Sequence, residues 1–71
     1  MRTIDCKGSS NLVSADYNAD AEELTLAFQN GTTYVYDGIP QSMADAFASA
    51  PSKGSYLAQQ IKPNFAARRT V

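Results

Sequence analysis

The sequence contains no histidine and only one cysteine, Cys6. A disulfide within the chain is therefore impossible, and a zinc site of thiolate or imidazole ligands, which needs about four of them, is excluded. A lone cysteine is typical of the reducing cytosol, and we expect Cys6 to be a free thiol on a flexible N-terminus. We accordingly predict a cytoplasmic protein without a cofactor or a bound metal.

Long apolar runs are absent as well. No segment approaches the roughly 20 apolar residues that a membrane-spanning helix needs. The first residues, MRTIDCKGSSN, lack the apolar centre of a signal peptide. These absences predict a protein that makes no contact with a membrane.

Residue pairs typical of active sites are also missing. Without histidine there is no serine–histidine pair, and the P-loop pattern G-x-x-x-x-G-K does not occur. The acidic stretch ADAEE, residues 19–23, is typical of a solvated connecting loop rather than of a shaped metal site. We therefore predict that the protein is not an enzyme.

Basic residues are few and lie mostly at one end of the chain. Six Lys and Arg residues against seven Asp and Glu residues give a formal net charge of -1, which argues against tight binding to duplex DNA. Acidic side chains occupy the middle of the chain, whereas the C-terminal third carries Lys53, Lys62, Arg68 and Arg69 without an acid among them. This asymmetry indicates either an anion-binding end or an ordinary solvated surface.

The 71 residues suffice for one small domain with a single core. We predict a flexible N-terminus at residues 1–9, one domain over residues 10–65 and a basic tail at residues 66–71. Within the domain, alternating apolar residues predict strands at residues 11–18, 23–28 and 32–36. In the first of them we expect Val13, Ala15 and Tyr17 to share one face. The QNG turn joins the other two into a hairpin and completes an antiparallel meander.

The second half of the chain changes to helical spacing. Apolar residues recur every three or four positions between Met43 and Ala50, and Ser42 with Asp45 resembles a capping box. Pro51 ends this helix, and a second short helix follows at once. The fold class is therefore predicted as α+β, a three-stranded antiparallel meander followed by two short helices packed on one face.

Tyr34 and Tyr36 follow the hairpin turn, and the turn length decides where their rings point. A two-residue turn at Asn30 and Gly31 would place the rings opposite the leucine face, open to a ligand. A three-residue loop with Gly31 left-handed would instead pair Leu26 with Tyr34 and put the rings on the apolar face. One buried tyrosine removes about 150–250 Å² from water, so we favour the three-residue loop in so small a domain.

The stretch PSKGS opens the second helix. Ser52, Lys53, Gly54 and Ser55 combine hydroxyls, a cation and a glycine that permits close approach. The unpaired amides of a helix start attract anions, which makes this stretch a candidate phosphate or carboxylate site. Simple capping by Ser52 accounts for the same residues.

Segments in the order SSNLVSADY, LTLAF, GTTYVY, IP and APSKGSYLAQQIK resemble the KTSC domain over about residues 9–65. The central Y-x-Y of that family corresponds to Tyr34 and Tyr36, and its S-x-G before an aromatic corresponds to Ser52, Gly54 and Tyr56. The KTSC domain is a short module found at the C-terminus of some lysyl-tRNA synthetases and alone in bacterial and phage proteins. The resemblance implies an RNA-binding role and no catalytic activity.

Two functions are compatible with these features. In the first, the chain binds RNA or a nucleotide, with phosphate at the second helix start and a base stacked on a tyrosine. The residues predicted for that site are Ser52, Lys53, Gly54, Ser55, Lys62, Arg68, Arg69, Tyr34, Tyr36 and Tyr56. In the second, the chain is a protein-interaction module, such as a small phage-encoded inhibitor of a host enzyme, that uses its acidic loop and an exposed sheet edge. A homo-oligomer is compatible with both, because so small a core often needs a neighbour.

Overall fold

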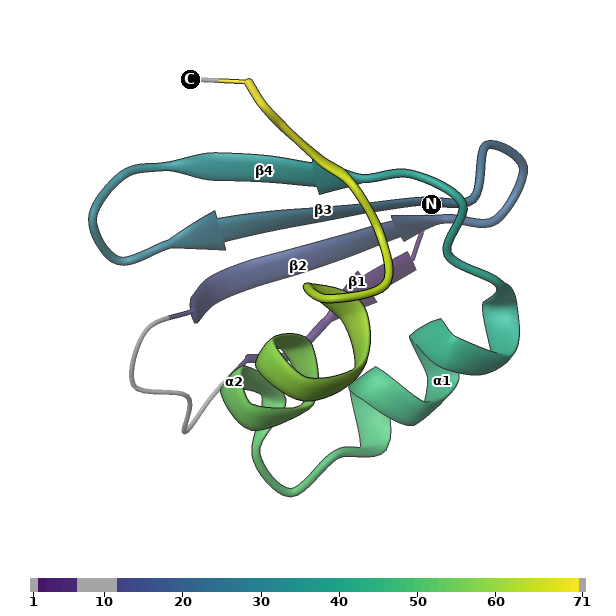
Figure 1. Cartoon of the computed structure of the whole chain (residues 1–71). Helices are drawn as coiled ribbons and strands as arrows, with labels where there is room; N and C mark the ends of the chain where they lie inside the picture. Colours follow the sequence, from purple (N-terminus) through teal and green to yellow (C-terminus); the bar gives the residue numbers. More distant parts are fainter. Residues whose placement is uncertain (1, 7–11, 71) are drawn as a thin grey trace.

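The computed structural model describes residues 2–6 and 12–70 (Figure 1). Residues 1 and 7–9 of the predicted flexible N-terminus, residues 10 and 11 of the predicted domain and residue 71 of the predicted tail lie outside the described residues. One antiparallel sheet has the strand order β1-β2-β3-β4-β5. Its strands are β1 (Arg2–Ile4), β2 (Leu12–Asn18), β3 (Glu23–Phe28), β4 (Thr33–Tyr36) and β5 (Ala67–Arg69).

The prediction of three strands is wrong, because short strands near both ends of the chain extend the sheet to five. β1 has three residues, too few for a periodic signal, and places Thr3 opposite Asp16. β5 is exposed along its whole length and places Arg68 opposite Val35 on β4. Hydrogen bonding of the backbone, rather than burial of alternate side chains, therefore defines β5.

The hairpin of β3 and β4 has the register that the three-residue loop predicts. Leu24 lies opposite Tyr36, and Leu26 lies opposite Tyr34. Gly31 has a φ of 86°, the left-handed conformation that glycine adopts in a bulged turn. Tyr36 is consequently buried and Tyr34 half-buried, which confirms that the rings face the core.

A β-bulge in β2 changes the predicted position of Val13. The register with β3 shifts between Leu12 and Ser14, so Val13 is the extra residue of the bulge. Val13 is 56% exposed, whereas Leu12 is 2% exposed. The expectation that Val13 shares a face with Ala15 and Tyr17 is therefore wrong, because a bulge moves the alternation of side chains by one position.

Two helical segments lie against the same face of the sheet (Figure 1). The first is α1 (Gln41–Ser49), and the second consists of α2 (Lys53–Tyr56) continued by the π-helical turn η1 (Leu57–Ile61). In that turn the Lys62 amide donates to the Leu57 carbonyl at 2.7 Å. Such widened turns occur often at functional sites.

The helix starts differ in how they are capped. α1 begins directly behind Pro40, and no side chain caps it. The predicted capping box is therefore wrong, because Ser42 already lies inside the first turn of the helix. Ser52 caps α2 as predicted, and its Oγ accepts a hydrogen bond from the Ser55 amide at 3.3 Å.

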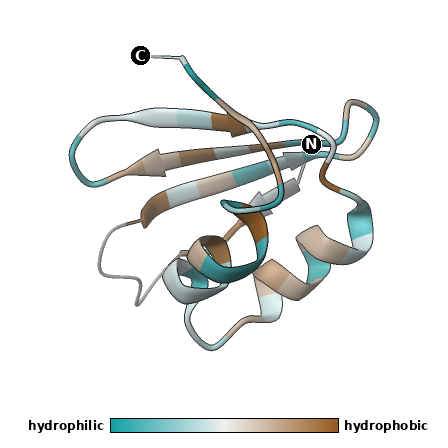
Figure 2. Ribbon diagram, viewed as in Figure 1, coloured by the Kyte–Doolittle hydropathy of each residue, from teal (hydrophilic) through white to brown (hydrophobic). Residues whose placement is uncertain are grey.

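Apolar side chains of the strands and both helical segments form one core, and Figure 2 shows the hydrophobic residues along these elements. Cys6 belongs to it at 4% exposed, so the expectation that this thiol sits on a flexible terminus is wrong. Burial raises the pKa of the Cys6 thiol, and the nearby charge of Lys53 opposes part of that rise. Tyr17 is also buried, and its hydroxyl donates to the Ile39 carbonyl at 2.6 Å, which ties the sheet to the connection before α1.

Candidate ligand-binding cavity

A cavity of about 450 Å³ lies between the end of the β3–β4 hairpin and the second helical segment. The helical segment supplies one wall, the hairpin the opposite wall, and the chain leading into β5 closes one side. The lining residues are Phe28, Asn30, Tyr34, Tyr36, Gly54, Leu57, Ala58, Lys62, Phe65 and Ala67. Its volume is in the lower part of the usual range for small-molecule sites, about 300–1,000 Å³.

Aromatic rings form much of the wall. Phe28 and Tyr34 lie edge to face, with ring centroids 5.8 Å apart and planes at 84°. The three-residue loop produces this contact, because it puts Tyr34 on the same face of the hairpin as Phe28. Phe65 follows η1 and adds a third half-buried ring.

Neutral polar side-chain atoms at the cavity come from two tyrosines and one asparagine, and Lys62 adds a charged one. Within residues 2–6 and 12–70, neither Tyr34 nor Tyr36 has a hydrogen-bond partner for its hydroxyl, yet no buried polar side-chain atom there is left unpaired. The Tyr36 hydroxyl therefore reaches solvent although its ring is buried. Burial raises the pKa of Tyr36, and the neighbouring Tyr34 raises it further.

Asn30 is held in one orientation at the rim. Its Oδ1 accepts a hydrogen bond from the Thr32 amide at 3.0 Å. An amide NH can only donate, so the partner atom must be the oxygen, and the Nδ2 group is left as the available donor. The cavity thus combines aromatic walls, two hydroxyls and one amide donor.

The structure separates the predicted anion site into two groups. Gly54 and the exposed Lys62 line the cavity together with the two tyrosines. The Ser52 hydroxyl oxygen accepts a hydrogen bond from the Ser55 backbone amide and thereby caps α2. Lys53 lies near the Cys6 thiol and does not line the cavity.

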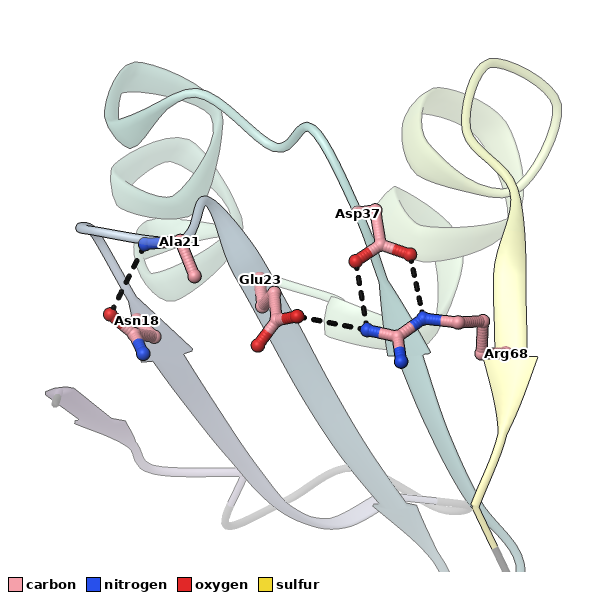
Figure 3. A network of polar contacts seen from close by, with 5 residues as sticks. All are labelled: Asn18, Ala21, Glu23, Asp37 and Arg68. Atoms are coloured by element: carbon pink, nitrogen blue, oxygen red, sulfur yellow. Dashed lines mark hydrogen bonds and ion pairs between the residues drawn. The ribbon is translucent and has the colours of Figure 1, made fainter.

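Arg68 faces the sheet surface opposite the helices. Its guanidinium donates to both carboxylate oxygens of Asp37, at 2.8 and 2.9 Å, and to Glu23 at 2.8 Å (Figure 3). These hydrogen bonds hold the pKa of the Asp37 carboxyl below its usual range. Arg68 thus fastens β5 to β4 and β3, and the structure does not bring it together with the cavity.

The two remaining predicted residues lie beside the cavity. Arg69 is opposite Tyr34 across β4 and β5, so its side chain emerges on the cavity side of the sheet. Tyr56 packs on Phe47, with ring centroids 6.1 Å apart. The structure therefore gathers Tyr34, Tyr36, Gly54 and Lys62, and leaves the others around or away from them.

Six lining residues were missed by the sequence analysis: Phe28, Asn30, Leu57, Ala58, Phe65 and Ala67. The turn contained a signal for Phe28 and Asn30, because the three-residue loop places the residues of the turn next to the strand that carries Tyr34. Nothing in the sequence showed that residues 65–67 return to β4. Among the described residues, no group of three or more Cys, Asp or Glu side chains is placed to hold a metal ion, and no helix is long and apolar enough to cross a membrane.

The model of the KTSC domain family matches residues 8–65. The chain belongs to the KTSC domain family. A crystal structure of a KTSC domain protein from Yersinia pestis is similar over the whole fold, with a TM-score of 0.88 and 31% identity. That similarity covers 99% of this KTSC domain and 100% of the Yersinia chain.

Similar regions occur in proteins of very different length. Lysine–tRNA ligases of Trichormus variabilis and of a Nostoc species are 35% and 37% identical over 49 residues, which is 69% of this KTSC domain. The chain spans only 9% of the length of these ligases. A protein of Tsukamurella paurometabola is 34% identical over 59 residues, 83% of this chain and 88% of its own length. KTSC regions therefore occur inside large ligases and in short proteins of about this size.

Proposed function

We propose that this KTSC domain is a non-catalytic module that binds single-stranded RNA or a nucleotide in the cavity. The observation that carries the proposal is the convergence of Phe28, Tyr34 and Lys62 on one cavity. Stacking of a base on an aromatic side chain contributes about 1–3 kcal/mol. A lysine beside the rings supplies the charge that a phosphate needs.

The similar proteins support RNA as the ligand over other flat, charged molecules. Two of them are lysine–tRNA ligases, so a module that contacts RNA suits the proteins that contain it. The formal net charge of -1 makes tight, nonspecific binding to long nucleic acid unfavourable. Recognition therefore depends on the cavity more than on the overall field of the protein.

Titration of the labelled full chain with single-stranded RNA at low salt, followed by NMR of its amides, tests this proposal. We expect chemical-shift changes at Asn30, Tyr34, Gly54 and Lys62, and a binding curve that saturates. Absence of any change at these residues at millimolar RNA would refute the proposal.

Variants separate the cavity from the surface. Tyr34→Leu keeps an apolar side chain but removes the ring, and we expect binding to weaken about 5-fold or more. Lys62→Gln should weaken it about two- to fivefold, as expected for one exposed ionic contact. Lys53→Gln makes the same change of charge outside the cavity, and a loss equal to that of Lys62→Gln would move the site to the start of α2.

A further inference from the structure

We infer that the cavity takes one nucleotide unit at a time, with a single base stacked in the corner formed by the Phe28 and Tyr34 rings and one phosphate at Lys62. The unit is either a free mononucleotide or one unstacked residue of an RNA strand. This inference rests on the proposed function and specifies the size and polarity of its ligand. The geometry of the rings, the number of charges and the state of Asn30 carry it.

The ring geometry forms a corner rather than a platform. Proteins that bind runs of bases present successive aromatic faces along a strand. Here the planes of Phe28 and Tyr34 meet at 84°, so a base stacked on one ring meets the other ring edge-on. The corner therefore offers one stacking position to a flat ring, and the cavity of about 450 Å³ has a volume in the range of single small-molecule ligands.

The charges at the cavity match one phosphate. Lys62 is the one charged side chain among the lining residues of the described chain, and no acid lines the cavity. Arg69 emerges next to Tyr34 on the same side of the sheet, where a neighbouring phosphate of a strand would pass. Arg68 is held by Asp37 and Glu23 on the other face. Among the described residues, the cations at and beside the cavity are therefore Lys62 and Arg69.

Asn30 adds a preference for the edge of the base. Because its Oδ1 accepts a hydrogen bond from the Thr32 amide at 3.0 Å, the Asn30 amide is held in one orientation and its Nδ2 group is available to donate to a ligand. A donor fixed at the rim favours a base that carries a carbonyl oxygen on its edge. Uracil is the smallest such base, and uridine monophosphate is therefore the test ligand.

A length series tests the single-nucleotide size. The full chain is titrated by NMR with uridine monophosphate, then with uridine di-, tetra- and octanucleotides, and separately with uridine and with inorganic phosphate. We expect the monophosphate to change the amide chemical shifts of Asn30, Tyr34 and Lys62. The affinity of the octanucleotide should exceed that of the monophosphate only by the statistical factor that its eight equivalent units provide. For the octanucleotide, log K against log salt should have a slope no steeper than about -1.4, which corresponds to two phosphate contacts.

Each contrary outcome has a distinct meaning. If long RNA binds at the cavity but the monophosphate does not, or if the slope is much steeper, the single-nucleotide inference fails while the proposed function stands. If no RNA of any length shifts these amides, both fail. If inorganic phosphate alone reproduces the shifts, the base has no part in binding and the inference is overturned.

Asn30→Asp tests the edge preference. Aspartate keeps an oxygen for the Thr32 amide, so the turn is preserved while the donor is lost. Gln29→Glu adds the same charge at the adjacent position, which is exposed and outside the cavity. We expect Asn30→Asp to weaken uridine monophosphate binding about two- to tenfold beyond the effect of Gln29→Glu. Equal effects of the two variants would overturn the role of Asn30.

Discussion

Removal of the Tyr17 hydroxyl tests how far one buried hydrogen bond supports this small domain. In the folded chain this hydroxyl donates to the Ile39 carbonyl at 2.6 Å, and Tyr17 is 2% exposed. Tyr17→Phe keeps the ring but leaves the carbonyl without its donor, a loss of about 1–3 kcal/mol. A chain of 71 residues has a total stability of about 4–10 kcal/mol. The variant should therefore lose a substantial part of it.

Urea unfolding followed by circular dichroism measures the loss, with Tyr34→Phe as the matched control. The Tyr34 hydroxyl has no partner among the described residues, so its removal should change stability by less than about 0.5 kcal/mol. For Tyr17→Phe we expect a lower midpoint at unchanged slope, and a Tm lower by about 4–8 °C for each kcal/mol. Equal stability of the two variants would refute the reasoning from the buried hydrogen bond.

Three further predictions concern the turn, β5 and alkaline pH. Gly31→Ala should lose about 1–2 kcal/mol in urea unfolding, because its φ of 86° disfavours a side chain although no atom lies within 4 Å of the added carbon; Gly31→Asn should lose less, and equal losses would contradict this. Arg68→Gln should speed hydrogen exchange of the Thr70 amide, which donates to β4 at 3.0 Å, and an unchanged rate would show that the ion pairs do not hold β5. Since burial raises the pKa of Tyr36, the folded chain retains its proton while the unfolded chain releases it. Stability should thus be intact below about pH 10 and fall above it, less so in Tyr36→Phe; identical pH profiles would count against burial as the cause.

The hairpin could be predicted because local chemistry decides it. The QNG sequence permits a left-handed glycine, and burial of two rings selects the loop that turns them inward. The same argument placed Tyr34 beside the leucines, where the structure has it. The second helical segment was likewise predictable, because Pro51 ends the first helix directly before it.

The edge strands and the bulge could not be predicted from the same signals. Residues 67–69 bury no side chain, so their pairing with β4 depends on backbone hydrogen bonds and on the contacts of Arg68 with residues more than 30 positions away. The bulge at Val13 breaks the alternation that the prediction assumed. Sequence periodicity reports alternate burial, which β5 lacks and which the bulge interrupts.

The cavity was partly predictable, because some of its lining residues belong to local sequence motifs and others do not. Tyr34, Tyr36, Gly54 and Lys62 were named from local motifs, and the fold brings all four to one cavity. Phe65 and Ala67 join them only because the chain returns to β4 after η1, which no local pattern indicates. The basic residues of the C-terminal third were predicted to act as one group. Alternate residues of a strand point to opposite faces of the sheet, so the side chains of Arg68 and Arg69 on β5 lie on different faces.

The strand order determines how such a module can be joined to other domains. A polypeptide that precedes residue 2 enters along β1, at the edge of the sheet opposite β5. Two strand spacings of about 4.8 Å separate β1 from β3, so the β1 edge lies about 10 Å from the nearer strand of the hairpin that walls the cavity. A fused neighbour on that side can pack along the β1 edge and still leave the cavity open.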